Sequence, residues 1–401
     1  MPGWHERTSE WVKQGRLTVV GVIQEQHPER CRLFAQWKQF GWPILYDPIN
    51  VLNTTAVPIT VAIDEAGIVR AVGPSKDDFA AIFLDRTFPN PGIRADAPSL
   101  TPSLDSISLA KRADKTGNAT DWRSLGDNLA LWQSPARINE AIAAYETAIK
   151  VADDDFPSHF RLGVCLRMRH ETKDRHLGDF ARAVTSWEKA LAGNPNQYIW
   201  RRRLQQFGPR LNKPYPFYDW VIAAEAGIRS RGEIPIELPV RPSGAELAEP
   251  SKKFIGASRR ATSPDPRGLI SRDLNALVRA SVTVVPTMVT PGETARVHIT
   301  FIPNRERQTH WNNESDPLQL WVEDPANGQV AEHLLQMADV AAPVSKEIRR
   351  LDFEVLVPAD ARDTITLQAY ALYYVCEDEN GQCKYLRQDL GIRLPVRSTA
   401  K

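Results

Sequence analysis

Proline-rich stretches divide this chain into three blocks, and this division is the strongest constraint on how it can fold. The 401 residues include 30 prolines, many of which lie between segments with regular hydrophobic patterns. Residues 89–120 and 231–278 combine proline with serine, aspartate or arginine, so they are predicted to be linkers. Blocks 1–88, 121–230 and 279–397 remain, and the sequence therefore predicts a multidomain protein.

Residues 1–88 alternate between helix and strand patterns. RLTVVGVI (16–23) is a nearly continuous apolar run, as in a strand buried on both faces. Two further strands, VPITVAID and GIVRAVG, are joined by a turn at residues 65–67. A closing helix has Ser75 as its predicted cap. The predicted order is helix, strand, helix, strand, strand, helix, which indicates an α/β domain.

Residues 121–230 are predicted to be helical and to repeat a pair of helices. Two segments share a spacing of small, aromatic and small residues that lets neighbouring helices approach closely: Ala141, Tyr145 and Ala148 match Ala183, Trp187 and Ala190. This spacing resembles the tetratricopeptide repeat (TPR), and the resemblance implies helices that dock a protein partner. Two units are too few for a free-standing solenoid, so we expect them to lean on a neighbouring domain.

Residues 279–397 are rich in predicted strands. Segments such as TARVHITFIP, RLDFEVLVP and TITLQAYALYYVC are β-branched or aromatic, and turn signals separate them. Regularly spaced strands without long helices predict a C-terminal antiparallel β-sandwich.

AVPITVAIDEAGIVR (56–70) resembles a segment of thioredoxin-like redoxins of the TlpA type, in which a proline precedes a core strand. The resemblance covers about the first 88 residues. It implies a thioredoxin-like α/β domain, a cis bond between Val57 and Pro58, and a substrate-binding role for these two residues. Those proteins carry Cys-x-x-Cys at the start of the first helix, and here both cysteines would lie before Met1. We therefore expect an incomplete domain.

The strand that precedes the first helix of such a domain is also missing. In this family it lies between the strands that correspond here to LTVVGVI and ITVAID. Unpaired backbone groups in those two strands would cost about 1–3 kcal/mol each if buried. We expect residues upstream of Met1 to supply the strand and the cysteine pair. The alternatives are that the two strands pair directly or that another segment fills the gap.

Two of the four cysteines, Cys376 and Cys383, flank Asn380-Gly381 in a predicted hairpin. Directly paired strand residues have Cα atoms about 4.5–5.5 Å apart, which suits a disulfide. Such a bond would contribute about 2.5 kcal/mol as a structural link. An exchangeable redox pair is the second possibility. A zinc site is the third, although His298, His310 and His333 show no ligand spacing.

ALYYVCEDENGQC followed by IRLPV resembles the amino-terminal, immunoglobulin-like domain of DsbD-type thiol–disulfide interchange proteins. This resemblance covers roughly the last 120 residues. It implies that Cys376 and Cys383 are catalytic and exchange electrons with a thioredoxin-like partner protein. Tyr373, Tyr374 and Tyr385 would shield the sulfur atoms.

The other two cysteines are predicted to stay unpaired. Cys31 lies on a helix beside Arg30 and Arg32, whose charges would favour a thiolate, but no second cysteine is near. His27 and Cys31 have metal-ligand spacing without a third ligand. Cys165 lies in the apolar run LGVCLRM, where a core position is expected.

Composition excludes several classes of function. The net charge is +1, which gives no overall electrostatic attraction to nucleic acids or membrane surfaces. No apolar stretch approaches a membrane span, and no phosphate loop, Ser-His-Asp arrangement or HExxH motif is present, so no cofactor is expected. The DsbD resemblance favours an exported, periplasmic protein, whereas the opening MPGWHERTSE is not a signal peptide, and the compartment stays open.

Together these patterns predict a thiol–disulfide redox protein that passes electrons between thiol pairs. The alternative is a non-catalytic binding or scaffold protein, in which TPR-like helices dock a partner and the cysteine pair is a structural disulfide.

Overall fold

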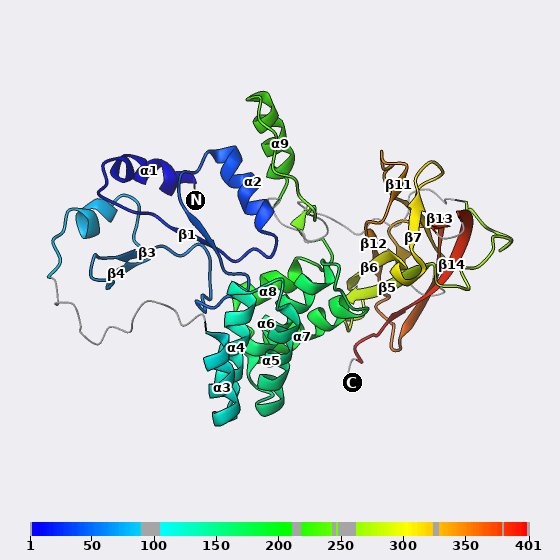
Figure 1. Cartoon of the computed structure of the whole chain (residues 1–401), viewed down its shortest axis with the longest axis horizontal. Coiled ribbons are helices and arrows are strands. Elements are labelled where there is room, and N and C mark those ends of the chain that lie inside the picture. Colours follow the sequence, from blue (N-terminus) through cyan, green and yellow to red (C-terminus); the bar gives the residue numbers. More distant parts are fainter. Residues whose placement is uncertain are drawn as a thin grey trace. The chain divides into compact units, whose positions relative to one another are not determined.

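A computed structural model shows a multidomain protein of mixed helices and sheets (Figure 1). It describes residues 2–89, 105–210, 218–242, 246–247, 262–323, 329–378 and 381–398. The chain forms two compact units. Unit 1 comprises Met1–Asp174, Ser186–Arg203 and Tyr218–Arg241, and unit 2 comprises Arg175–Thr185, Leu204–Phe217 and Pro242–Lys401.

The first block of unit 1 follows the predicted element order with one additional strand. Its elements are α1 (Pro2–Lys13), β1 (Gly21–Ile23), α2 (Pro28–Lys38), β2 (Ile44–Tyr46), β3 (Val61–Ile63), β4 (Val69–Val72) and a π-helix, η1 (Ala80–Leu84). β1 pairs with β2 in parallel, and β3 pairs with β4 antiparallel. Gly67, at a φ of +75°, supplies the left-handed conformation that the turn between β3 and β4 requires.

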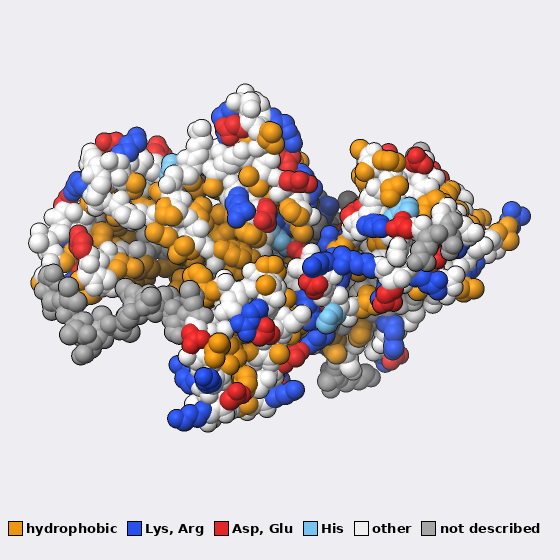
Figure 2. Space-filling model, viewed as in Figure 1, with side chains coloured by type: hydrophobic (Ala, Val, Ile, Leu, Met, Phe, Trp, Pro, Cys, Tyr) orange, Lys and Arg blue, Asp and Glu red, His pale blue; other side chains and the backbone are white. Residues whose placement is uncertain are grey.

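The strands β1 and β3 lie in two separate two-stranded sheets. Direct pairing of these strands, one of the alternatives raised by the sequence, is therefore absent from the described part of the chain. β1 is also shorter than the apolar run 16–23 suggested. The side chains of Val20, Val22, Val61 and Ile63 are 42–53% exposed. Figure 2 shows apolar side chains gathered on the surface of this part of the chain.

A run of helices follows: α3 (Ser106–Thr116), α4 (Ala119–Trp132), α5 (Ile138–Val151), α6 (Phe156–His170), α7 (Asp179–Gly193) and α8 (Tyr198–Gln205). α3 lies inside the stretch 89–120 that was predicted as a linker. It forms because the Asp105 side chain accepts a hydrogen bond from the Ile107 backbone N–H and Gly117 ends the helix at a φ of +64°. α4 packs against both α3 and α5, and α5 packs against α6.

The residues that carry the predicted helix-pair spacing are all in the core. Ala141, Tyr145 and Ala148 on α5, and Ala183, Trp187 and Ala190 on α7, are each 0% exposed. Gly126 on α4 lies so close to Tyr145 that an added Cβ would be 2.6 Å from Cε1 of the ring. Glycine at position 126 therefore permits the close approach of α4 to the Tyr145 ring on α5.

The last helix of unit 1, α9 (Trp220–Ser230), packs against α2 near the beginning of the chain. Leu33 on α2 is fully buried in a cluster with Val221, Ala224 and Ile228. Leu238, from the stretch 231–278 that was predicted as a linker, completes this cluster. The α2 surface is therefore covered by residues about 200 positions later in the chain.

Unit 2 is built mainly from antiparallel strands: β5 (Val278–Val285), β6 (Thr294–Pro303), β7 (Thr309–Asn312), β8 (Gln319–Val322), β9 (Gln329–Val330), β10 (Leu334–Gln336), β11 (Val344–Ser345), β12 (Arg349–Leu356), β13 (Ile365–Glu377) and β14 (Gln382–Leu394). One sheet has the order β5-β6-β12-β9, and the other has the order β10-β8-β13-β7-β11 with β14 also paired to β13. Buried residues from both sheets form one hydrophobic core.

Candidate redox site at a hairpin disulfide

Two long strands position the predicted cysteine pair. β13 and β14 are joined as a hairpin and stay in register over 13 residue pairs, from Ile365↔Leu394 to Glu377↔Gln382. The odd-numbered residues of β13 from Leu367 to Val375 face the hydrophobic core. Because side chains alternate along a strand, the even-numbered residues, including Cys376, face the other side of the sheet.

Cys376 and Cys383 are directly paired across the hairpin and form a disulfide, with a Cα–Cα distance of 4.0 Å. The predicted hairpin disulfide is thus confirmed, as is the expectation that Cys31 and Cys165 remain free thiols. Residues 379–380 of the connecting turn lie outside the described residues.

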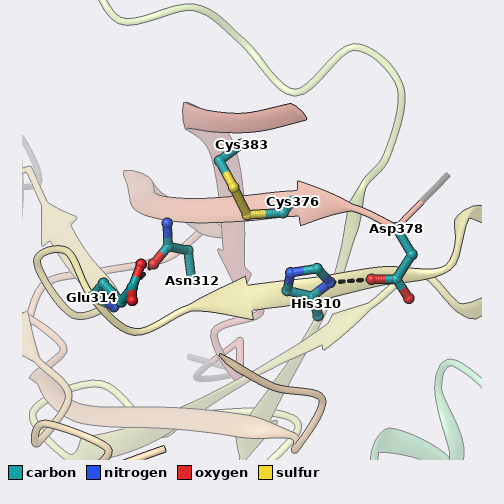
Figure 3. The surroundings of a disulfide bond; sticks show 6 residues. All are labelled: His310, Asn312, Glu314, Cys376, Asp378 and Cys383. Atoms are coloured by element: carbon teal, nitrogen blue, oxygen red, sulfur yellow. Dashed lines mark hydrogen bonds and ion pairs between the residues drawn. A yellow bond between two sulfur atoms is a disulfide. The ribbon is translucent and has the colours of Figure 1, made fainter. Parts of the chain in front are cut away.

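The two sulfur-bearing residues differ in their access to solvent. Cys376, on the central strand β13, is only 3% exposed. Cys383, on the edge strand β14, is exposed. Figure 3 shows the bond spanning the two strands. Cys383 is therefore the more solvent-accessible residue of the pair.

A histidine lies on the other side of Cys376. His310 on β7 is the direct cross-strand partner of Cys376, so Cys383, Cys376 and His310 form one row across three strands. Nδ1 of His310 is hydrogen-bonded to Oδ1 of Asp378, as Figure 3 shows. Nζ of Lys346 also donates to Asp378, at 2.6 Å. These hydrogen bonds lower the pKa of the Asp378 carboxyl and keep it ionised, and the bond from Lys346 has the larger effect.

Two of the three predicted shielding tyrosines lie on the disulfide face. Tyr374 and Tyr385 are paired across the hairpin and stack with ring centroids 4.3 Å apart. Burial raises the pKa of Tyr385 to about 12. Tyr373 was also expected to shield the sulfurs, but strand alternation turns it into the core. There it is 0% exposed and its hydroxyl donates to Asp273.

The Val57–Pro58 bond is cis, as predicted. Both residues are exposed and precede β3 in unit 1, and Val57 is 54% exposed. Their role in substrate binding stays a prediction.

The two free thiols lie in surroundings that oppose the reactive thiolate. Burial, assisted by the negative charge of Glu25, raises the pKa of Cys31. The pKa of Cys165 is raised by complete burial on α6. Among the described residues, no group of three or more His, Cys, Asp or Glu side chains is arranged to hold a metal ion. In the same residues, no helix has the length and apolar character needed to cross a membrane.

A buried charged cluster in unit 1 was not anticipated from the sequence. Although burial alone would raise the pKa of Glu25, the charges of Arg30 and Arg203 lower it to about 2. The Glu25 carboxylate also accepts a hydrogen bond from Tyr218, 193 residues away. Burial lowers the pKa of the neighbouring His27 to about 4.

Comparison with known proteins leaves the family of this chain open. No family model matches the sequence, and no curated protein matches it. A solved structure of Spo0M, a sporulation control protein from Bacillus subtilis, is 10% identical over 31% of this chain and half of its own length, with a TM-score of 0.18. A FixG-related protein from Vibrio parahaemolyticus is 12% identical over 30% of this chain and 97% of its own, with a TM-score of 0.17. Likenesses this weak carry no argument about function.

Proposed function

We propose that this protein is a thiol–disulfide redox protein that exchanges electrons between its Cys376–Cys383 pair and a thiol pair of a partner protein. The observation that carries the proposal is the asymmetry of the disulfide. Cys376 is 3% exposed and Cys383 is exposed on an edge strand. A purely structural link needs no such difference, whereas directed exchange requires one sulfur to be open to attack and the other to be protected.

The chemistry follows from this asymmetry. A thiolate of the reduced partner attacks Sγ of Cys383, a new partner–Cys383 disulfide forms, and the Cys376–Cys383 bond breaks. The electron pair of the broken bond passes to Sγ of Cys376. The second thiol of the partner then attacks the first partner sulfur, which is bonded to Cys383 in the mixed disulfide. An intramolecular disulfide forms in the partner, and Cys383 is released as a thiolate. Two electrons have moved from the partner dithiol to this protein.

The sequence resemblances support this proposal and extend it to the whole chain. In the extended form, residues 1–88 are a redoxin-type, thioredoxin-like domain of the TlpA type, with Val57 and Pro58 in its substrate groove. Residues 121–230 are TPR-like helices that dock a protein partner. Residues 279–397 are a β-sandwich similar to the amino-terminal domain of DsbD-type proteins. In this arrangement the end domains exchange electrons.

Trapping of a mixed disulfide tests the proposal. Cys376→Ala leaves the exposed Cys383 thiol to capture a partner, whereas the matched variant Cys383→Ala leaves only the sheltered Cys376. We expect reductant-sensitive complexes with Cys376→Ala and few with Cys383→Ala. We also expect a reduction potential above about −250 mV, as in exchangeable disulfides. A potential below about −300 mV together with no trapped complex would refute redox exchange.

The second candidate is a non-catalytic binding or scaffold protein with a structural disulfide. It is favoured by the raised pKa values of Cys31 and Cys165, which leave no activated free thiol among the described residues. In this case every partner recovered with the wild-type protein should also be recovered with Cys376→Ala, and reductant should release none of them.

A further inference from the structure

We infer that His310, oriented by Asp378, donates a proton to Cys376 when the disulfide opens. This inference rests on the proposed function and assigns the group that assists the buried leaving sulfur. The decisive observation is the register of three neighbouring strands, which places His310 and Cys383 on opposite sides of Cys376.

Direct pairing places the imidazole and the sulfur on the same face of the sheet, on neighbouring strands. Side chains of directly paired residues in an antiparallel sheet lie on the same face, with Cβ atoms about 4.5–5.5 Å apart. His310 is therefore beside Cys376 on the face that carries the disulfide, as Figure 3 shows. The His310 side chain is 14% exposed and Cys376 is 3% exposed, so both residues are largely shielded from water.

The Asp378 carboxylate determines which ring nitrogen serves the sulfur. Because Asp378 accepts from Nδ1–H of His310, Nε2 is the nitrogen that remains for Cys376. A carboxylate on one nitrogen fixes the orientation of the ring and stabilises the imidazolium. The pKa of Asp378 is lowered by its hydrogen bonds to Lys346 and His310, so this carboxylate remains ionised when it does so.

The charged groups around His310 lie at the ends of two strands, β13 and β11. Asp378 follows β13, and Lys346 follows β11, the strand on the other side of β7. Lys346 binds the second oxygen of Asp378 and thus offsets part of its negative charge. Glu377 at the end of β13 is paired instead with Lys384 at 2.8 Å and with Arg307 at 3.7 Å.

The proton transfer completes the exchange step described above. The partner thiolate bonds to Sγ of Cys383, and the electron pair of the disulfide moves to Sγ of Cys376. The imidazolium Nε2–H of His310 gives its proton to that sulfur, leaving a neutral imidazole and a Cys376 thiol. A better-stabilised leaving thiolate departs faster, so His310 accelerates attack specifically at Cys383.

The test is the rate at which dithiothreitol reduces the disulfide between pH 5 and pH 9, corrected for the thiolate fraction of the reagent. In wild-type protein the corrected rate should rise at least tenfold as pH falls through the range in which imidazoles titrate. His310→Gln should remove this rise and be at least tenfold slower at pH 6. Asp378→Asn should give an intermediate profile, and it serves as the second variant if His310→Gln does not fold.

A thiol titration provides the independent readout. In Cys383→Ser, which leaves Cys376 as a free thiol, a nearby imidazolium should hold the pKa of Cys376 below the ordinary value of about 8.5. Adding His310→Gln should raise it by at least one unit. His333→Gln is the matched control, because His333 is hydrogen-bonded to the Val322 carbonyl on β8 and does not pair with Cys376.

The outcomes separate this inference from the proposed function. If wild-type and His310→Gln proteins show the same corrected rate profile and the same Cys376 pKa, the role of His310 is refuted even if partners are trapped at Cys383. If the profiles differ as expected but no partner is trapped and the reduction potential lies below about −300 mV, the inference about proton donation stands and the proposed exchange with a protein fails.

Discussion

Lowering the pH from 7 to 5 should decrease the free energy of local unfolding of helix α2. At pH 5, His27 binds a proton when this region is unfolded but not when it is folded. His27 precedes α2, and its side chain is 7% exposed. Nδ1 lies 3.4 Å from Oε2 of Glu171, and Nε2 is buried without a hydrogen-bond partner among the described residues. Burial, the largest cause, lowers its pKa from 6.5 to about 4. The imidazole therefore stays neutral in the fold at pH 5.

The magnitude follows from linkage between protonation and folding. Between pH 6.5 and pH 4 the unfolded chain binds a proton at His27 that the folded chain does not bind, so stability falls as pH falls through this window. One pKa unit corresponds to about 1.4 kcal/mol, which gives a loss of about 2 kcal/mol at pH 5 and about 3 kcal/mol below pH 4. Glu25, with its pKa lowered from 4.5 to about 2, loses its contribution only below pH 4.5.

Amide hydrogen exchange in α2, read by mass spectrometry and corrected for intrinsic rates, measures this local opening free energy. It avoids treating a chain of two units as one cooperative transition. Wild-type protein should lose about 2 kcal/mol between pH 7 and pH 5, and His27→Gln should lose much less. His5→Gln should behave like wild type. An equal loss in His27→Gln and wild type would refute the assignment to His27.

Three further predictions concern packing and surface. Reducing the hairpin disulfide, which joins residues with a sequence separation of 7, should lower the free energy of unfolding of unit 2 by about 2.5 kcal/mol in urea titrations. An unchanged urea midpoint would contradict stabilisation by restriction of the unfolded chain. Gly126→Ala should destabilise the α4–α5 pair by about 1–3 kcal/mol, because the new Cβ would overlap the Tyr145 ring. A melting temperature equal to that of wild type would show that the ring can move aside without cost. Val61→Lys combined with Ile63→Lys should reduce self-association in sedimentation velocity, because both side chains are about half exposed on a strand. Equal sedimentation of the variant and wild type would refute a role for this surface in association.

The features that were predictable from the sequence depend on residues close together in the chain. Asn380-Gly381 and the strand patterns around it were sufficient to predict the pairing of Cys376 with Cys383, because a short hairpin fixes its own register. The spacing of Ala141, Tyr145 and Ala148 identified a buried helix face, because helical periodicity is local.

The features that were missed depend on pairings between distant segments. Nothing in the sequence indicated that His310 would lie beside Cys376, because the register of β7 on β13 is set by the packing of the whole sheet. Likewise, Glu25 and Tyr218 are 193 residues apart, and their hydrogen bond exists only once α9 has packed on α2. α3 was missed for a local reason: the prolines nearby are typical of a linker, whereas the helix depends on a single cap at Asp105.

The packing of α9 on α2 also determines how long the apolar face of α2 stays uncovered during translation. The apolar face of α2 around Leu33 is covered by residues that extend to Leu238, and the Arg30 side chain hydrogen-bonds the carbonyl oxygen of Val240. At about 5–20 residues per second, a ribosome needs roughly 10–40 s after α2 to deliver these partners. During that interval the Leu33 face is a natural target for chaperones that hold nascent chains. Codon changes that slow translation between α2 and α9 would lengthen this exposure without altering a single residue.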